Sequence, residues 1–363
     1  MAEASDDGPT RAGDQRAPAE RSRLLVVTSI YPTRDRPEAG AFVWRRVEAL
    51  RVRGVVVDVL APSGYRSSAL RRHVALGLRA LLPRRRPDGV EGHVLFVAGF
   101  IALIAARLHR RPLLIYAHGA DVRVTAQRTP VHRALARLVA RGADIVVTNS
   151  AATAGFVAML GATAEIVPPG VDFERFSPGD RADARARLGL PRDRLIALYV
   201  GGLSERKGAD VFAAAVAAAP AWRGVMVGAG ELGAEIRTRY PAIRLEGVQP
   251  PDGVPDWMRA ANVVVVPSRE EPLGLAAVEG LACGVPVVAS ETGGLAQVVQ
   301  PELNGLLIPP ADAAALTGAL GRLEDEGLRE RLGAAARASV ARHDIRTTSE
   351  EMSSLWRRLG VTT

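Results

Sequence analysis

The chain has a single cysteine, Cys283, among its 363 residues. It therefore has neither an internal disulfide framework nor a zinc site built from cysteines. Its longest apolar run, residues 94–106, is shorter than the roughly 20 residues that a membrane-spanning helix needs. No charged segment followed by an apolar run and a small-residue cleavage site marks a secretory signal. We expect a soluble, cytoplasmic protein.

Lysine is almost absent, because 46 of the 47 basic side chains are arginine and the only lysine is Lys207. Residues 1–170 carry 25 basic and 14 acidic side chains, a net charge of +11, whereas residues 171–363 carry 22 and 25, a net charge of −3. Arginine clusters between residues 71 and 86 favour an anionic partner, such as the inner face of a membrane or a phosphorylated substrate. An arginine-rich surface without a partner explains them about as well. We expect no nucleic-acid partner, because no aromatic side chains are interleaved with the clusters.

Short β-branched runs alternate with Ala-, Leu- and Arg-rich stretches of helical period, which indicates repeated strand-helix-strand units. Strands are predicted at residues 24–30, 55–60, 113–117, 145–148 and 164–167, and then at residues 195–200, 224–227, 243–245, 263–266 and 285–289. Near-continuous Val, Ile and Leu is typical of parallel strands that are covered on both faces. The predicted fold class is α/β, with two Rossmann-like, doubly wound parallel-sheet domains that face each other across a cleft.

The turn Pro168-Pro169-Gly170 separates the two strand series and sets the predicted domain boundary. Residues 1–22 are predicted to be a disordered tail, residues 23–170 the first domain and residues 171–345 the second. A last helix within residues 346–363 is predicted to cross back to the first domain. Ligands of such folds bind beyond the carboxyl ends of the strands, so we expect functional residues in the loops that follow strands.

The segment from Tyr199 to Gly208 joins a predicted strand to a helix and holds Lys207 next to Arg206. Backbone amides, a helix N-terminus and two cations around one point suit a phosphate group, although the spacing is not that of a Walker A loop. An ordinary turn with a solvated Arg-Lys pair is the alternative. Because the chain uses arginine almost everywhere and keeps its one compact ammonium here, we predict that Lys207 binds phosphate.

Residues Gly228 to Gly233 form a G-x-G-x-x-G motif that follows a strand and opens a helix. Glu246 stands 18 residues after Gly228, near where the ribose-binding acid of a dinucleotide fold is expected. An NAD-dependent oxidoreductase is therefore the main alternative function. Against it, the motif follows the second strand of its domain, whereas the first strand is followed by the Lys207 loop.

The loop after the strand at residues 263–266 leads into a helix and carries two carboxylates, Glu271 and Glu279. Between them, Gly274 and Leu275 lie at a helix N-terminus, where free amides favour an anion. A sugar hydroxyl at Glu271, a phosphate at these amides and the vicinal hydroxyls of a ribose at Glu279 together describe a nucleotide-sugar. Two solvated glutamates on an ordinary strand-helix unit are the alternative.

In the first half, Gly40 precedes a predicted helix and allows the backbone to approach a ligand closely. His118 and Asp121 follow the strand at residues 113–117, at the edge that faces the cleft. Such a pair can serve acid–base chemistry or bind hydroxyl groups. A lone histidine at a strand end is more often structural, so this interpretation depends on the rest of the cleft.

Taken in order, these elements resemble the retaining glycosyltransferases of family 4, which have the GT-B architecture, over about residues 24–345. The resemblance rests on the loop at Gly40, on His118-Gly119-x-Asp121, on Lys207-Gly208 and on the segment from Glu271 to Glu279. Further matching runs are Val167-Pro168-Pro169-Gly170-Val171-Asp172, Ala282-Cys283-Gly284-Val285-Pro286 and Gly293-Gly294.

The resemblance implies transfer of a sugar from a nucleoside diphosphate to an acceptor hydroxyl, with retention at the anomeric carbon. It places catalytic roles on His118, Glu271 and Lys207, and puts Asp121 on the acceptor side. The other donor-binding residues that it implies are Gly40, Arg206, Gly247, Val248, Leu273, Gly274, Leu275 and Glu279. The first domain would then meet the acceptor, which is a glycan, a lipid-linked sugar or a small molecule, and the second would bind the nucleotide-sugar. The arginine clusters of the first domain favour an acceptor on an anionic inner membrane face.

Two positions depart from the family pattern. Gly202 stands five residues before Lys207, where the family usually has arginine, and Arg206 is the candidate substitute. The segment Glu271-Pro272-Leu273-Gly274 replaces the commoner Glu-Gly-Phe-Gly. A protein that binds nucleotide-sugars without turnover is therefore a non-catalytic alternative.

The chain contains no Asp-x-Asp pair and so no evident seat for a catalytic divalent metal. We expect no metal and no other cofactor. Lys207, Arg206 and helix N-termini would stabilise the departing diphosphate instead.

Overall fold

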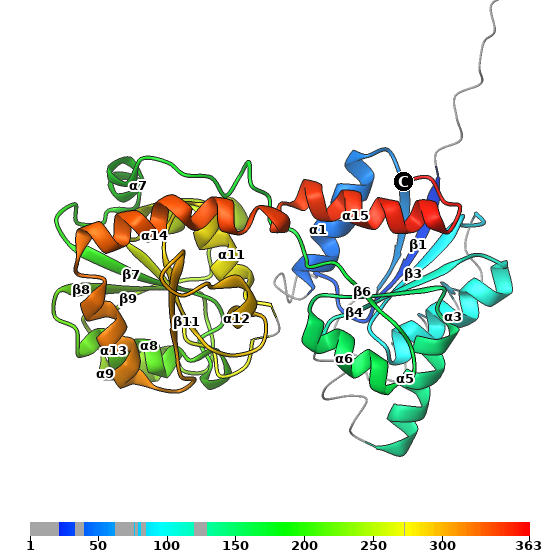
Figure 1. Cartoon of the computed structure of the whole chain (residues 1–363), viewed down its shortest axis with the longest axis horizontal. Helices are drawn as coiled ribbons and strands as arrows, with labels where there is room; N and C mark the ends of the chain where they lie inside the picture. The colour runs from blue at the N-terminus through cyan, green and yellow to red at the C-terminus, as the bar shows by residue number, and fades with distance from the viewer. Residues whose placement is uncertain are drawn as a thin grey trace, which may run out of the picture.

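The structure, a computed structural model, describes residues 22–32, 40–61, 76, 79–80, 85–119, 129–271 and 273–363. These residues form two lobes, each built on a six-stranded sheet (Figure 1). The strand order is β2-β1-β3-β4-β5-β6 in the first sheet and β12-β11-β10-β7-β8-β9 in the second. Neighbouring strands are parallel throughout both sheets. The predicted α/β class with two parallel sheets is confirmed.

The elements of the first half alternate as the strand-helix pattern predicts. The strands are β1 (Arg23–Val27), β2 (Val56–Leu60), β3 (Gly89–His93), β4 (Leu113–Ala117), β5 (Ile145–Thr148) and β6 (Glu165–Ile166). The helices are α1 (Ala41–Val52), α3 (Val97–His109), α5 (Pro130–Gly142) and α6 (Ala151–Met159).

The second half repeats this alternation. Its strands are β7 (Leu195–Val200), β8 (Trp222–Val227), β9 (Arg244–Gly247), β10 (Val263–Val266), β11 (Val287–Ser290) and β12 (Gly305–Ile308). Its helices are α7 (Arg181–Leu188), α8 (Ala209–Ala217), α9 (Gly233–Arg239), α10 (Val254–Ala260), α11 (Leu275–Ala282), α12 (Leu295–Val298), α13 (Ala313–Arg322) and α14 (Glu326–Ser339), and short 3₁₀ turns are η2 (Glu205–Lys207), η3 (Pro251–Gly253) and η4 (Ala341–His343). The chain ends with α15 (Ile345–Arg358).

Alternate residues of the central strands face two separate hydrophobic cores. In β1, Leu24 and Val26 pack in the core that holds residues of α1 and α15, whereas Leu25 and Val27 pack with residues of α3 and α5. In the second sheet, one core holds residues of α10, α11 and α14 and the other residues of α8 and α13. Helices therefore cover both faces of each sheet, which is why the strands are apolar on both sides.

The sequence pattern does not predict β3, although this strand lies between β1 and β4 at the centre of the first sheet. Its five residues include two glycines, Glu91 and His93, and all five are buried. Gly92 permits a close helix, because a Cβ there would lie 2.8 Å from the Cβ of Ala102 in α3. Strand propensity is low for these residue types, so tertiary packing decides this strand. The pattern also misses β12.

Helix α15 follows α14 across the molecule and lies over the first lobe (Figure 1). Trp356 is fully buried there, in the core that also contains Leu24 and Val26 of β1. Gly89 accommodates the indole, because a Cβ at Gly89 would lie 2.6 Å from a ring carbon of Trp356. The two segments that connect the lobes run side by side, with Val171 paired to both His343 and Ile345 through backbone hydrogen bonds of 2.8 Å. The C-terminal helix thus completes the core of the first lobe.

Replacing Trp356 by alanine is expected to lower the free energy of unfolding by about 3–5 kcal/mol, because a buried aromatic side chain is lost and a cavity remains. The measurement follows hydrogen exchange of the backbone amides of β1 and β3 at increasing denaturant concentration. The denaturant midpoint at which these amides become exposed is compared with that of wild type. Val52→Ala, at a position that is 87% exposed, is the control and should change the midpoint little. An unchanged midpoint for Trp356→Ala would show that α15 does not stabilise the first sheet.

Candidate active site

The loops that follow β7 and β10 meet at the carboxyl edge of the second sheet. Gly208 has a φ of +70°, and a Cβ there would lie 1.9 Å from the carbonyl oxygen of Pro267, so only glycine permits this approach. The amide of Arg269 donates to the carbonyl of Arg206 at 3.0 Å. Lys207 Nζ donates to Glu271 Oε2 at 2.5 Å. Folding thus joins Lys207 and Glu271, which sequence patterns single out in separate motifs.

The surrounding loops support the Glu271 side of this pair. Ser268 Oγ donates to Glu271 Oε2 at 3.4 Å, and the amide of Gly294 donates to the Glu271 carbonyl at 3.0 Å. The neighbouring cation Arg269 forms a two-point ion pair with Asp210, at 2.8 and 2.6 Å. Leu273 is buried beneath the loop, whereas the side chain of Arg206 is exposed.

Helix α11 begins at Leu275, four residues after Glu271 in the chain. Gly274 stands at its N-cap with a φ of +79°, and no side-chain cap is present among the described residues. The amides of Ala277 and Val278 donate to the carbonyl of Gly274. The amides at the start of a helix lack intrahelical acceptors, so this terminus attracts an anion at Leu275.

Glu279 lies on the second turn of α11 and is buried, with a side chain that is 9% exposed. Arg45 of α1 reaches it from the other lobe, with Nη1 3.2 Å from Glu279 Oε1. Burial raises the pKa of Glu279, and the Arg45 guanidinium opposes this shift. The sequence singles out Glu279 but not Arg45, because a single arginine among 46 carries no signal.

The glycines of the G-x-G-x-x-G motif let two loops pack closely. A Cβ at Gly228 would lie 1.9 Å from the Gly201 carbonyl oxygen, and one at Gly230 would lie 2.3 Å from the Leu203 carbonyl oxygen. The amide of Leu203 donates to the Ala229 carbonyl at 3.0 Å. Contact with the Lys207 loop therefore accounts for this motif without a bound dinucleotide.

The end of β9 lies beside this motif. The amide of Gly228 donates to the carbonyl of Gly247 at 2.7 Å, and the side chain of Val248 is 67% exposed. Glu246 is ion-paired with Arg244. Val248 is thus open to solvent, while the Gly247 carbonyl and the Glu246 carboxylate are already engaged.

The loop also has room for a Cβ at Gly202, where the family pattern places arginine. The nearest atom to a Cβ at Gly202 would be the Ala229 carbonyl oxygen at 3.9 Å. Tyr199 donates its hydroxyl to the carbonyl of Gly202 at 2.6 Å. Backbone packing therefore does not impose glycine at this position.

In the first lobe, Gly40 starts α1 with a φ of +69° and approaches its own chain closely. A Cβ at Gly40 would lie 2.5 Å from the carbonyl oxygen of Ile30. His118 follows β4, and the rings of Phe42, His93 and Tyr116 have centroids 4.4, 5.1 and 4.6 Å from its ring. Asp121 lies outside the described residues.

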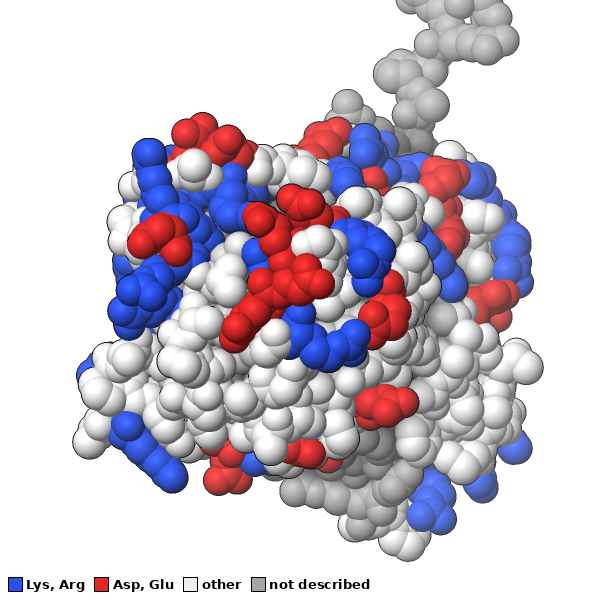
Figure 2. Space-filling view, turned by 60° about the vertical axis from the view of Figure 1, so that its left-hand side comes forward, with Lys and Arg blue, Asp and Glu red and all other residues white. Residues whose placement is uncertain are grey.

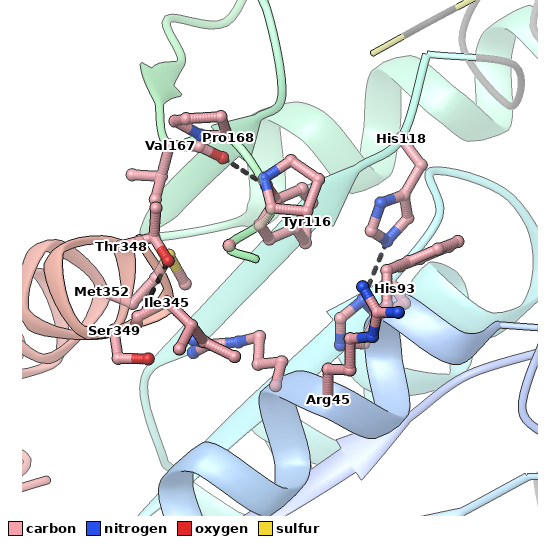
Figure 3. Close-up of a pocket in the computed structure, with 14 residues that line it drawn as sticks. Arg45, His93, Tyr116, His118, Val167, Pro168, Ile345, Thr348, Ser349 and Met352 are labelled. Atoms are coloured by element: carbon pink, nitrogen blue, oxygen red, sulfur yellow. Dashed lines mark hydrogen bonds between the residues drawn. The ribbon is translucent and has the colours of Figure 1, made fainter. Parts of the chain in front are cut away.

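A chain of polar side chains extends from His118 into the sheet, and Figure 3 shows its first link, from His118 to His93. His118 Nε2 lies 2.9 Å from His93 Nδ1, and His93 Nε2 lies 3.1 Å from Glu91 Oε1. Arg46 of α1 donates to both Glu91 oxygens, through Nε at 2.5 Å and Nη2 at 2.8 Å. The sequence did not single out Glu91, His93 or Arg46. The available signal was an acid and a histidine at alternate positions, which share one face of a strand.

These contacts set the protonation of the chain. Burial acts to raise the pKa of Glu91, but Arg46 and the hydrogen bonds from Arg46 and His93 outweigh it and hold the pKa far below the ordinary value. Burial, and then His93, lower the pKa of His118 well below 6.5. His93 Nδ1 and His118 Nε2 lie within hydrogen-bond distance, so one of these two nitrogens donates a proton to the other. His118 is therefore a neutral hydrogen-bonding group.

A small cavity of about 40 Å³ opens beside His118, opposite the segment that connects the lobes and α15 (Figure 3). Arg45, His93 and His118 line one side of it. Residues 167–170 and the α15 residues Ile345 and Met352 line the other. Arg45 thus borders the His118 cavity and contacts Glu279 of the second lobe.

The charge asymmetry of the chain is visible only in part. Figure 2 brings the second lobe forward and shows basic and acidic side chains mixed over the upper part of this face, above a broad uncharged area. Most of residues 71–86, with their arginine clusters, lie outside the described residues. Among those that are described, no helix is long and apolar enough to cross a membrane and no three His, Cys, Asp or Glu side chains gather as metal ligands. Contact with an anionic membrane stays a prediction.

Replacing Glu91 by glutamine is expected to lower the free energy of unfolding at neutral pH by about 3–5 kcal/mol, because Arg46 loses its buried counter-charge. Below the ordinary pKa of 4.5, the unfolded wild-type chain takes up a proton that folded Glu91 does not, so wild type loses stability and the difference shrinks. Denaturant unfolding over a pH series measures it, with the exposed Glu48→Gln as control. A difference that is constant from neutral to acid pH would contradict the ionised state of Glu91.

Two family models match the chain. One, described as Glycosyltransferase Family 4, matches residues 22–175, and the other, described as Glycosyl transferases group 1, matches residues 194–326. A D-inositol 3-phosphate glycosyltransferase from Acidothermus cellulolyticus is 38% identical over 245 residues, which are 60% of this chain and 54% of that protein. Relatives with this name are matched over 47–65% of their own length, so the chain spans about half to two thirds of them.

Solved structures share the architecture of the whole chain. Sucrose-phosphate synthase from Thermosynechococcus elongatus has a TM-score of 0.81 at 26% identity, with 94% of this chain and 99% of that chain covered. The Anabaena protein HepE in complex with UDP-glucose has a TM-score of 0.76 at 21% identity, with 93% and 99% covered. The fold is therefore GT-B, and the two family models place the chain in glycosyltransferase family 4.

Proposed function

We propose that the protein is a retaining glycosyltransferase that moves a sugar from a nucleoside diphosphate sugar to an acceptor hydroxyl. The observation that carries the proposal is the convergence of Lys207, Glu271 and the uncapped N-terminus of α11, with Glu279 one turn behind. Family membership supports it, as does the likeness to a structure in complex with UDP-glucose.

The diphosphate of the donor would lie between Lys207 and the first amides of α11. An ammonium and a helix N-terminus both favour the negative charge that grows on the diphosphate as the bond to the sugar breaks. We expect these groups to act without a divalent metal. In the structure the Lys207 ammonium contacts Glu271 at 2.5 Å. Donor binding would therefore exchange part of that contact for phosphate oxygens.

The two glutamates would hold the two sugars of the donor. Glu279 would accept the vicinal hydroxyls of the ribose, and Glu271 a hydroxyl of the transferred sugar. Gly247 and the exposed residue Val248 would meet the base. His118, neutral and held by His93, would bind the transferred sugar as a hydrogen-bonding group.

We propose an anionic acceptor on the side of the first lobe. The first 170 residues carry a net charge of +11, which attracts anions. Relatives that match the chain are named for D-inositol 3-phosphate, which carries a phosphate. An NAD-dependent oxidoreductase is not favoured, because loop packing accounts for the glycine motif.

Transfer or hydrolysis is expected with one of UDP-, GDP- or dTDP-sugars, and is measured as released nucleoside diphosphate.

Lys207→Ala should raise the activation free energy of transfer by about 2–4 kcal/mol, because one charged contact to the leaving group is lost. Lys207→Arg should restore only part, since the planar guanidinium does not match the compact ammonium. Arg223→Ala, at an exposed position on β8, is the control. Binding of a nucleotide-sugar without any product would favour the non-catalytic alternative, and near-normal turnover in folded Lys207→Ala would contradict the phosphate role.

Separate substitutions of the two glutamates should have different effects. Glu279→Ala is expected to weaken binding of the free nucleoside diphosphate, because the ribose hydroxyls lose their acceptor. Glu271→Ala should leave this affinity nearly unchanged and lower transfer, because it would face the sugar. Isothermal titration and initial rates measure the two effects. Equal losses of nucleoside diphosphate affinity in both variants would contradict the assigned division.

A further inference from the structure

We propose that Arg45 is a positioning residue for the donor: from the opposite lobe, it orients the Glu279 carboxylate that accepts the ribose hydroxyls. Binding of a nucleoside diphosphate then depends on contact between the two lobes. This inference rests on the proposed function, in which Glu279 binds the ribose.

The ion pair between Arg45 and Glu279 crosses from one lobe to the other. Arg45 lies in the first turns of α1 and Glu279 in the middle of α11, 234 residues away in the chain. Their side chains are 24% and 9% exposed, so water screens the pair little. The next residue, Arg46, turns instead to Glu91 within its own lobe. Adjacent arginines of one helix therefore serve two different acids, one in each lobe.

The geometry leaves Glu279 able to bind a ligand. Arg45 contacts Oε1 through one guanidinium nitrogen at 3.2 Å. An ionised carboxylate has about four acceptor positions, so two vicinal hydroxyls can be accepted while the arginine stays in place. The arginine holds the Glu279 carboxylate in one orientation before the ligand binds. Without it, binding of the ribose would also have to fix that orientation.

Arg45 also favours the charged form of Glu279. Burial on α11 raises the pKa of Glu279, and the groups that oppose this shift are Arg45 of α1 and then Arg175 of the segment after β6. At the C-cap of the same helix, Cys283 interacts electrostatically with Glu279. The charged side chains of α10 and α14, Arg259, Asp256 and Arg337, act on Cys283. Without Arg45, the balance therefore shifts towards protonated Glu279, which has fewer acceptor positions for hydroxyls.

The position of Arg45 links the two parts of the site. Arg45 lines the cavity of His93 and His118 on the first lobe (Figure 3). It also contacts the carboxylate of Glu279 on the second lobe, which is proposed to bind the ribose. A stabilising pair between the lobes could form at many exposed positions. This one uses the buried carboxylate at the donor site, which points to a role in binding.

The test is titration of the nucleoside diphosphate that the wild-type protein binds (UDP, GDP or dTDP) over a pH series. Arg45→Met is expected to weaken binding about tenfold at acid pH, because protonated Glu279 loses a charge-assisted bond to the ribose hydroxyls. The loss should shrink as the pH rises, because Glu279 ionises. Arg45→Lys should restore binding, and Arg51→Met, which removes an exposed arginine of the same helix that pairs with Glu48, should follow wild type at every pH. Unfolding midpoints check that each variant folds, and Arg45→Gln replaces Arg45→Met if the latter does not.

Glu279→Gln separates this inference from the proposed function. The Glu279→Gln variant should bind the nucleoside diphosphate weakly, and the affinity should vary with pH only as the ligand itself titrates. Adding Arg45→Met to this variant should not change the affinity further. If Glu279→Gln binds weakly but Arg45→Met binds as wild type at every pH, the positioning role is wrong and the ribose role stands. If Arg45→Met binds more tightly than wild type, Arg45 competes with the ribose and the inference is overturned. If Glu279→Gln binds as wild type, the ribose assignment fails and the inference fails with it.

Discussion

Parallel strands end at the same edge of a sheet, and the candidate site depends on this constraint. The loops after β7 and β10 leave the second sheet side by side, so Lys207 and Glu271 meet although 64 residues separate them. The absence of a Cβ at Gly208 lets the two loops approach to van der Waals contact of their backbones. The start of α11 follows directly, which adds the dipole of a helix to the same point.

In the first lobe, a buried negative charge lies next to the histidines of the site. Glu91 is fully buried on a central strand, and removal from water disfavours its ionised form. Two hydrogen bonds from Arg46 and the nearby His93 offset that penalty. The stacked rings of His93, Tyr116 and His118 then line one side of the cavity. His118 is thus held by packing and by a hydrogen bond, and its neutral form follows from its surroundings.

Several contacts join the two lobes in addition to the connecting segments. The C-terminal helix α15 follows α14 of the second lobe and contributes Trp356 to the core of the first. The backbone pairing of Val171 with residues 343 and 345 fixes where the two connecting segments pass each other. Arg45 and Glu279 add a polar contact between the lobes at the site itself. Contacts of different kinds therefore hold the lobes together, and only the last involves a residue proposed to bind the donor.

The family and the fold class follow from local sequence patterns, and both are confirmed. Strand and helix periods, glycines after strands and the spacing from Glu271 to Glu279 are properties of short segments, so they are visible without a structure. The roles of Lys207, Glu271, Glu279 and His118 stay predictions, because no ligand contact tests them. The expected strands miss β3, since glycine, glutamate and histidine carry little strand propensity and its glycines pack against α3 and α15.

Apart from β3 and β12, the sequence by itself determined the order of the strands, the two parallel sheets and the loops in which polar residues gather, because these depend on neighbours along the chain. Only the tertiary structure decided which of those residues touch. Arg45 is one of 46 arginines, and nothing near it in the sequence distinguishes it from Arg51. Its partner Glu279 is 234 residues away, and a contact between buried charges at that separation exists only after both lobes have folded and come together.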